Sequence, residues 1–247
     1  MNLETPENQS KNEIVKGKIY LIPTLLGEGK PEEMLPPYVL KIIREMHFFI
    51  VEEIRTARRF LSKVGIPHPI DSLTFFLLNE HTKTSDILLY LEPALTNNIG
   101  LMSEAGAPGV ADPGADIVRL AHQHGICVVP LIGPSSILLA LMASGLNGQN
   151  FAFNGYLPVK QPERVAKIRF FEKRAIMENQ TQVFIEAPYR NMQLLEDLLN
   201  TCIPSTMLSV AADISLETEF IKTGTIESWK KKIPQIHKRP AIFMIGK

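Results

Sequence analysis

The sequence predicts an α/β protein of two α/β domains, with a parallel sheet in the N-terminal domain and a mixed sheet in the C-terminal domain. The chain has 247 residues, which is enough for two domains of ordinary size. In its first half, short apolar runs alternate with longer amphipathic stretches, as in parallel sheets whose strands are joined by right-handed helical crossovers. In its second half, several apolar runs follow one another closely, which indicates a mixed sheet.

The elements of the first half follow from the spacing of apolar residues. Ile54, Ala57, Leu61 and Val64 recur at three and four residues, which predicts a helix that Gly65 ends. The continuous apolar character of the strands predicts a sheet covered on both faces. Strands are expected at 18–23, 47–52, 73–78, 99–103 and 127–132, and further helices near 82–95, 113–124 and 136–145.

The second half predicts strands in closer succession. They are expected at 150–157, 181–188, 206–214, 218–224 and 239–246, with a long charged helix between the first two. The organisation that follows is a disordered tail over 1–16, an N-terminal α/β domain over 17–132 and a C-terminal α/β domain over 133–247. A cleft between the two domains is the expected place for a ligand.

Composition limits the expected partners and location. The 26 Lys and Arg residues balance the 26 Asp and Glu residues, so no global basic field attracts nucleic acid. A local basic patch is compatible with that balance. No run approaches the roughly 18 apolar residues that a membrane span needs. Cys127 and Cys202 stand in apolar runs without a CxxC partner, which favours two buried, reduced thiols in a cytoplasmic protein.

The stretch SEAGAPGVADPGAD, residues 103–116, is rich in glycine and proline. Asp112 is well placed as a helix N-cap, with Pro113 at the first helical position. Capping does not require the preceding AGAPGV, whose glycines and alanines let another molecule approach the backbone closely. Two interpretations follow from the residues, a floor on which a ligand lies and a turn with a helix cap.

Three other loops share this construction, because proline or small residues follow the expected strands at Pro23-Thr24, in GPSS at 133–136 and in EAPYR at 186–190. Ligands of parallel sheets bind beyond the carboxyl ends of the strands, where helix N-termini offer unpaired N–H groups. The chain has no G-x-G-x-x-G, Walker A, H-E-x-x-H or G-x-S-x-G motif, and its histidines show no metal-ligand grouping. Hydride transfer, phosphoryl transfer, serine hydrolysis and a metal site are therefore not expected.

Four ordered motifs carry a family resemblance. SEAGAPGVADPG, VVPLIGPSSILLALMASGL, FNGYLPVKQPER and FIEAPYR resemble motifs of the tetrapyrrole methylase superfamily of S-adenosylmethionine-dependent methyltransferases. The resemblance covers about residues 17–247 and is closest to the branch of ribosomal RNA small subunit methyltransferase I, which methylates a ribose 2′-hydroxyl of 16S rRNA. It implies a tetrapyrrole methylase-like fold, a homodimer and S-adenosyl-L-methionine as the methyl donor.

The resemblance also implies which residues contact the cofactor. Backbone groups from Gly106 to Ala111 are expected to supply much of the binding, so a valine at 106 would fill cofactor space. Ser136 is expected either to bond the cofactor or to cap a helix. The expected cofactor residues are Pro23, Glu104, Gly106, Pro108, Val110, Ala111, Asp112, Ser135, Ser136, Leu157 and Ala212.

The residues expected to face the methyl acceptor depart from the branch. VEEIR stands where the branch has A-E-D-T-R, and Tyr189 stands where it has histidine. The candidate catalytic residues are Glu52, Arg55, Glu186 and Arg190, as proton acceptors or as cations for phosphate or carboxylate. Alternatively, each glutamate forms a structural ion pair with its arginine.

Three functions stay open at this point. The leading hypothesis is methylation of a ribose 2′-hydroxyl of 16S rRNA in the small ribosomal subunit. A methyltransferase for a tetrapyrrole or other small acceptor is the alternative within the family, and a non-catalytic S-adenosylmethionine-binding protein is the alternative outside it. The basic helix at 160–174 is either a solvated face or a patch for the RNA backbone.

Overall fold

The computed structural model describes residues 17–79 and 82–247, which form two compact units. The first unit comprises the described residues up to Ile22 together with Lys41–Glu104 and Pro108–Leu131. The second comprises Pro23–Leu40, Ala105–Ala107 and Ile132–Lys247. The tail expected over 1–16 lies outside the described residues, and the boundary at 132 and the cleft stay predictions.

The first unit contains the expected parallel sheet, with strand order β3-β2-β4-β1-β5. Every neighbouring pair in it is parallel. Its central strands β2, β4 and β1 carry most of the buried residues, because both of their faces are covered. The strands are β1 (Lys18–Ile22), β2 (Phe48–Val51), β3 (Thr74–Leu77), β4 (Ile99–Met102) and β5 (Cys127–Pro130).

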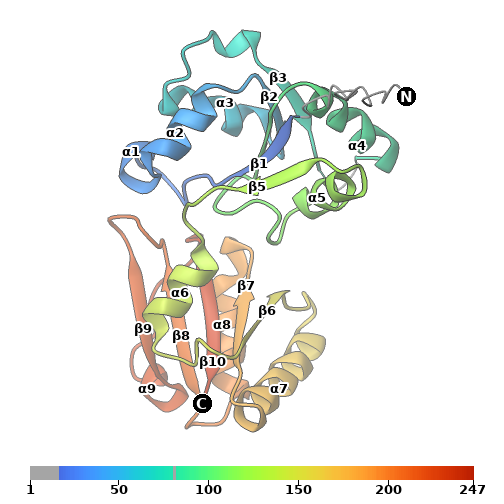
Figure 1. The fold of residues 1–247 in the computed structure, drawn as a ribbon. Coiled ribbons are helices and arrows are strands. Elements are labelled where there is room, and N and C mark those ends of the chain that lie inside the picture. Colours follow the sequence, from blue (N-terminus) through green and yellow to red (C-terminus); the bar gives the residue numbers. More distant parts are fainter. Residues whose placement is uncertain (1–16, 80–81) are drawn as a thin grey trace, which may run out of the picture. The chain divides into compact units, whose positions relative to one another are not determined.

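Helices of the first unit pack on this sheet through the apolar faces that the sequence predicts. In α4 (Thr84–Leu91) and α5 (Gly114–Gln123), Ile87 and Ile117 join one core with Ile50 and Leu101. In α3 (Ile54–Val64), three of the four residues whose spacing predicted the helix are buried, namely Ala57, Leu61 and Val64. Gly65 ends the helix with φ +75°. Figure 1 shows α4 and α5 beside each other in this unit.

Two features of the first 130 residues differ from the expectation. No helix is expected from the sequence between the strands at 18–23 and 47–52, but α1 (Pro31–Met34) and α2 (Pro37–Arg44) lie there. The signal for α2 is present, because proline suits a first helical position. Cys127 is exposed rather than buried, because β5 is an edge strand and its first position is uncovered. Cys202 is buried as expected.

The second unit contains a mixed sheet with strand order β6-β7-β10-β8-β9, as predicted. β6 and β7 are parallel, and the other three neighbouring pairs are antiparallel. The parallel pair places the carboxyl ends of β6 and β7 at the same edge of the sheet. The strands are β6 (Phe151–Tyr156), β7 (Thr181–Ile185), β8 (Met207–Ala212), β9 (Phe220–Thr225) and β10 (Ala241–Gly246).

Helices cover both faces of this mixed sheet. On one face, α6 (Ser136–Ser144) packs Ala140 and Leu141 against Val183 and Met244. On the other face, Phe184 joins the core formed with α7 (Gln161–Met177), α8 (Asn191–Thr201) and α9 (Ile226–Lys230). Figure 1 shows α6 in front of the strands and α8 behind them.

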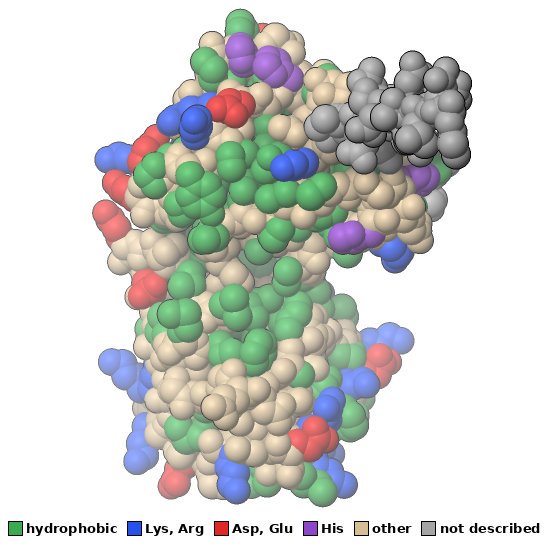
Figure 2. Space-filling view, viewed as in Figure 1, with side chains coloured by type: hydrophobic (Ala, Val, Ile, Leu, Met, Phe, Trp, Pro, Cys, Tyr) green, Lys and Arg blue, Asp and Glu red, His purple; other side chains and the backbone are tan. Residues whose placement is uncertain are grey.

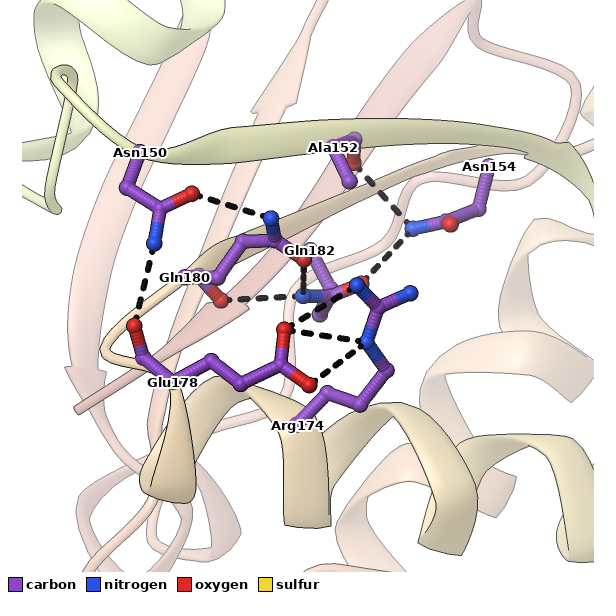
Figure 3. A network of polar contacts seen from close by, with 7 residues as sticks. All are labelled: Asn150, Ala152, Asn154, Arg174, Glu178, Gln180 and Gln182. Atoms are coloured by element: carbon purple, nitrogen blue, oxygen red, sulfur yellow. Dashed lines mark hydrogen bonds and ion pairs between the residues drawn. The ribbon is translucent and has the colours of Figure 1, made fainter.

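A polar network ties β6 and β7 to the end of α7 (Figure 3). Gln182, which is fully buried, donates to the carbonyl and side-chain oxygens of Gln180 at 3.1 and 2.9 Å and accepts from Asn154 at 3.1 Å. Gln180 donates to Asn150 at 2.9 Å, and Asn150 donates to the Glu178 carbonyl at 3.0 Å. Because the buried amide is bonded through both its oxygen and its nitrogen, this network holds β6 firmly beside β7.

Candidate functional site

The loop that follows β4 is held to the main chain of Thr24. Thr24 donates to the Gly106 carbonyl at 2.9 Å, and Gly106 donates to the Thr24 carbonyl at 3.2 Å. Gly106 has φ +77°, and a Cβ built on it would lie 3.2 Å from Leu26 Cδ2. A valine at 106 would therefore strain the folded protein itself, so it does not isolate the effect on cofactor space.

Asp112 ties the loop to the start of α5. Its carboxylate accepts from the Gly109 N–H at 2.8 and 2.9 Å and from the Gly114 N–H at 2.7 Å. The helix begins at Gly114, and Pro113 already has helical φ and ψ, so Asp112 caps much as expected. Burial raises the pKa of Asp112, while the N–H groups of Gly114 and Gly109 act in the opposite direction.

Several main-chain N–H groups in the rest of the loop have no hydrogen-bond partner among the described residues. Among residues 17–79 and 82–247, nothing hydrogen-bonds to the N–H groups of Ala107, Val110 or Ala111. Val110 is 49% exposed, and Gly109, with φ +81°, has nothing within 4 Å of where its Cβ would lie. Gly106 and the Gly109 N–H are already bonded within the protein, so the binding expected from the backbone of 106–111 would come from the other groups of the loop.

Glu52 lies at the carboxyl end of β2 and does not pair with Arg55. Glu52 Oε2 accepts from the Glu104 N–H at 3.0 Å. The start of α3 is instead capped by Glu53, which accepts from the N–H groups of Arg55 at 2.9 Å and Thr56 at 2.6 Å. Within the described residues no ion pair joins Glu52 to Arg55, so the alternative of a structural pair is wrong there.

The charge state of Glu52 is shifted by its surroundings. Burial raises the pKa of Glu52 most, and the carboxylates of Asp112 and Glu104 raise it further. The hydrogen bond from the Glu104 N–H opposes this shift. A carboxylate with a raised pKa is a better proton acceptor than an ordinary surface glutamate.

Glu186 and Arg190 form the ion pair that was the structural alternative for them. Arg190 donates to Glu186 Oε1 through Nε at 2.9 Å and Nη2 at 2.5 Å, and the Ala187 N–H donates to the same oxygen at 2.7 Å. The Glu186 side chain is 1% exposed, and its Oε2 has no hydrogen-bond partner in the described chain. The hydrogen bond to Glu186 raises the pKa of Arg190, so the guanidinium stays charged.

The remaining expected cofactor residues of the second unit differ in what their side chains contact. Ser135 caps α6 by accepting from the Leu138 N–H at 3.5 Å, so the capping role expected for Ser136 belongs to Ser135. Leu157 and Ala212 are buried in the hydrophobic core with Phe184. Their side chains pack against protein, and only their main-chain groups remain for a ligand.

Two prolines among the expected cofactor residues are buried. Pro23 lies against Gly133, where a Cβ would overlap the proline ring. Pro108 lies in the loop beside Gly109 and is also buried. The close approach of Pro23 explains why glycine occupies position 133, whether or not a ligand lies there.

Arg164 belongs to the basic stretch at 160–174 that the sequence offers as a solvated face or an RNA patch, but its side chain is buried. Its side chain is 1% exposed, and it donates to Asp197 Oδ2 through Nε at 2.7 Å. Its Nη1 donates to the Pro158 and Val159 carbonyls at 3.2 and 2.6 Å. The interpretation of 160–174 as a continuous basic face is therefore wrong at this position.

No helix within 17–79 and 82–247 is long and apolar enough to cross a membrane. In the same part of the chain, no three His, Cys, Asp or Glu residues are grouped so that they could hold a metal ion.

The fold and these motifs match known proteins. Residues 18–229 match the family Tetrapyrrole (Corrin/Porphyrin) Methylases. A Haemophilus influenzae protein named ribosomal RNA small subunit methyltransferase I is 29% identical over 233 residues, covering 93% of this chain and 78% of that protein. The crystal structure of the methyltransferase CobJ has a TM-score of 0.61 at 17% identity and covers 94% of each chain.

A further solved structure carries a bound ligand. Uroporphyrin-III C-methyl transferase from Thermus thermophilus, complexed with S-adenyl homocysteine, has a TM-score of 0.55 at 18% identity and covers 94% of this chain and 98% of its own. At this identity the structural likeness concerns the fold. The family match spans most of the chain, so this protein belongs to the tetrapyrrole (corrin/porphyrin) methylases and is an S-adenosylmethionine-dependent methyltransferase.

Proposed function

We propose that this methyltransferase transfers a methyl group to a ribose 2′-hydroxyl of 16S rRNA in the small ribosomal subunit. The observation that carries the proposal is the likeness to ribosomal RNA small subunit methyltransferase I over 93% of this chain, at 29% identity. The motifs at 103–114 and 153–164 that resemble that branch fall on a loop after β4 and on β6 with its following helix. A cytoplasmic location goes with this substrate.

The residues of the 104–112 loop fit the methyl donor. S-adenosylmethionine would supply an electrophilic methyl group on its sulfonium. The uncommitted N–H groups of Ala107, Val110 and Ala111 and the open space over Gly109 suit a ligand bound through main-chain contacts. We also assign contacts with the cofactor to the other expected residues, which are Pro23, Glu104, Gly106, Pro108, Asp112, Ser135, Ser136, Leu157 and Ala212.

The acceptor side is assigned to four charged residues. Glu52 takes up the proton that the ribose hydroxyl gives up, because its raised pKa makes it a stronger base than an ordinary surface glutamate. Arg55 is exposed and suits a phosphate of the RNA backbone. Glu186 and Arg190 position the acceptor, with the arginine fixed by its ion pair.

Glu52→Gln is expected to lower the methyl-transfer rate about 100-fold, because general-base catalysis contributes at least that much. The amide keeps an oxygen for the Glu104 N–H, so the fold is retained. Since burial raises the folded-state pKa above 4.5, the charged carboxylate destabilises the fold at neutral pH. The variant is therefore expected to melt above wild type at pH 7, with the difference shrinking as pH falls below 4.5.

Glu53→Gln is the matched control for this measurement. Hydrogen bonds from the N–H groups of Arg55 and Thr56 lower the pKa of Glu53, so this neighbour should lose stability at pH 7 instead. Its transfer rate should stay that of wild type. An unchanged rate in Glu52→Gln would remove Glu52 as the base.

The substrate is tested by tritiated methyl transfer to small ribosomal subunits from a strain that lacks this enzyme. We expect label in a ribose of 16S rRNA and none in porphyrinoids. Label in a porphyrinoid alone would favour the small-acceptor alternative. Calorimetric binding of S-adenosylmethionine without transfer to any acceptor would favour a non-catalytic binding protein.

We also propose that the chain is a homodimer. On α6, Leu138 is 51% exposed and Met142 is 79% exposed, although the helix is apolar on every side. Figure 2 shows apolar side chains gathered in the region that α6 occupies in Figure 1. Exposed apolar patches of this kind are typical of protein–protein contacts, which supports the homodimer that the resemblance implies.

A further inference from the structure

Two exposed tyrosines lie at the carboxyl end of β6 and just beyond the carboxyl end of β7, which are parallel strands. Tyr156 is the last residue of β6 and is 61% exposed. Tyr189 follows β7 in the EAPYR loop and is 63% exposed. The guanidinium of Arg190 lies 5.4 Å from the centre of the Tyr189 ring. Both tyrosines therefore stand at the edge of the sheet where ligands of parallel strands bind, and a cation lies beside the Tyr189 ring.

The position of Tyr156 depends on an irregularity in β6. Phe153 pairs with Val183, but Tyr156 pairs with Ile185, so β6 carries one extra residue between them. Gly155 accommodates it with φ +63°. In a regular strand, residues three apart face opposite sides. The extra residue instead puts Tyr156 on the same side as Phe153, and such bulges commonly redirect a side chain beside a functional site.

The strand that presents Tyr156 is held rigidly up to the bulge. Asn154 donates to the buried Gln182 at 3.1 Å and to the Ala152 carbonyl at 3.1 Å, as Figure 3 shows. Beyond the bulge, Arg164 donates to the Pro158 and Val159 carbonyls. Tyr156 therefore stands on anchored backbone on both sides, which lowers the entropy that a ligand must remove on binding.

Arg190 is also held in place by Glu186, and one of its guanidinium nitrogens remains available for a ligand. Its Nε and Nη2 bind Glu186, whereas its Nη1 has no partner among the residues that the structure describes. Its side chain is 20% exposed. The hydrogen bond to Glu186 raises the pKa of Arg190, so the cation beside the Tyr189 ring stays charged.

We propose that Tyr156, Tyr189 and Arg190 form a platform for single-stranded RNA, on which the two rings stack bases and Arg190 contacts a phosphate. The inference rests on the proposed function and names the part of the acceptor that these residues bind. Aromatic rings stack on unpaired bases of any sequence, and an arginine can bind a phosphate of the RNA backbone. The chain has no net charge, so stacking rather than a broad basic field would carry much of the affinity.

The experiment measures binding of a fluorescein-labelled single-stranded RNA of about 12 nucleotides by fluorescence anisotropy, without cofactor. Tyr189→Ala and Tyr156→Ala are each expected to raise Kd roughly tenfold, the effect of losing one base stack. Tyr189→Phe should bind like wild type, because the ring remains. A duplex of the same sequence should bind more weakly than the single strand.

Phe170→Ala is the matched control. Phe170 is 51% exposed, and Lys167 Nζ lies 5.4 Å from its ring centre, so it has the same pairing of ring and cation elsewhere on the unit. Its Kd should stay within about twofold of wild type, below the effect of one lost stack. An equal loss in Phe170→Ala would move RNA binding to the face of α7 and overturn the platform.

Other outcomes separate this inference from the proposed function. Tyrosine variants that bind RNA like wild type, or a wild-type chain that binds no RNA, would overturn the platform. Loss of uroporphyrin binding in the tyrosine variants, with RNA binding unchanged, would assign the platform to a small acceptor. Loss of RNA binding in the variants, together with no ribose methylation by wild type, would keep the platform and reject the proposed reaction. Calorimetry with S-adenosylmethionine checks that each variant is folded.

Discussion

Replacing Arg164 with methionine is expected to lower the free energy of unfolding by about 3–5 kcal/mol, the cost of leaving one charge of a buried ion pair unpaired. Arg164 and Asp197 are 1% and 7% exposed, and Arg164 Nη2 lies 2.6 Å from Asp197 Oδ2. Methionine fills much of the space but supplies no donor for the carboxylate or for the Val159 carbonyl. Denaturant unfolding of wild type and variant measures the difference.

Arg174→Met is the matched control, since it removes an arginine from the same helix. Arg174 pairs with Glu178 at 3.0 Å, but the two side chains are 36% and 48% exposed. An exposed pair is worth about 0–1 kcal/mol, so this variant should unfold close to wild type. The double variant Arg164→Met/Asp197→Leu should regain part of the loss, because no charge stays buried. Equal costs at 164 and 174 would contradict the assignment of a buried pair.

Gly109→Asn is expected to weaken S-adenosylmethionine binding at least tenfold while the chain stays folded. Asparagine tolerates the positive φ of this position better than other side chains do, and nothing lies within 4 Å of the new Cβ. The side chain would therefore extend into the open space above the loop, where we place the cofactor. Isothermal calorimetry measures the affinity, and thermal unfolding checks the fold.

Gly145→Asn controls for the backbone. Gly145 ends α6 with φ +69° and also has nothing within 4 Å of its Cβ position. The two substitutions therefore impose the same conformational cost and differ in their distance along the chain from the proposed cofactor loop. Gly145→Asn should keep wild-type affinity with a similar melting temperature. Wild-type affinity in Gly109→Asn would mean that the loop is a turn and nothing more.

The arrangement of strands and helices was largely predictable from the sequence because it depends on local periodicity. The run at 99–102 is apolar throughout and becomes the buried β4, and Ala57, Leu61 and Val64 face inward from α3. The loop after β4 was recognisable for a similar reason, since its glycines and prolines mark a backbone that side chains do not cover. The proposal that this loop contacts the methyl donor rests on motifs of several residues in order.

Partnerships between charged residues could not be predicted from spacing along the chain. Glu52 bonds to the Glu104 main chain 52 positions away rather than to Arg55, and its neighbour Glu53 takes the capping role. Arg164, one of six basic residues in its stretch, is buried because it meets Asp197 on the neighbouring helix 33 positions later. Which groups meet depends on helix packing and strand order, and neither leaves a local periodic signal.

The sequence by itself therefore determined the two sheets, the small-residue loop and the methyltransferase family. Tertiary structure alone decided that Cys127 is exposed on an edge strand and that Arg164 is buried in an ion pair. It also decided the register shift in β6 that pairs Tyr156 with Ile185. The physical reason is that secondary structure follows from contacts three or four residues apart, whereas burial and register follow from contacts between segments far apart in the chain.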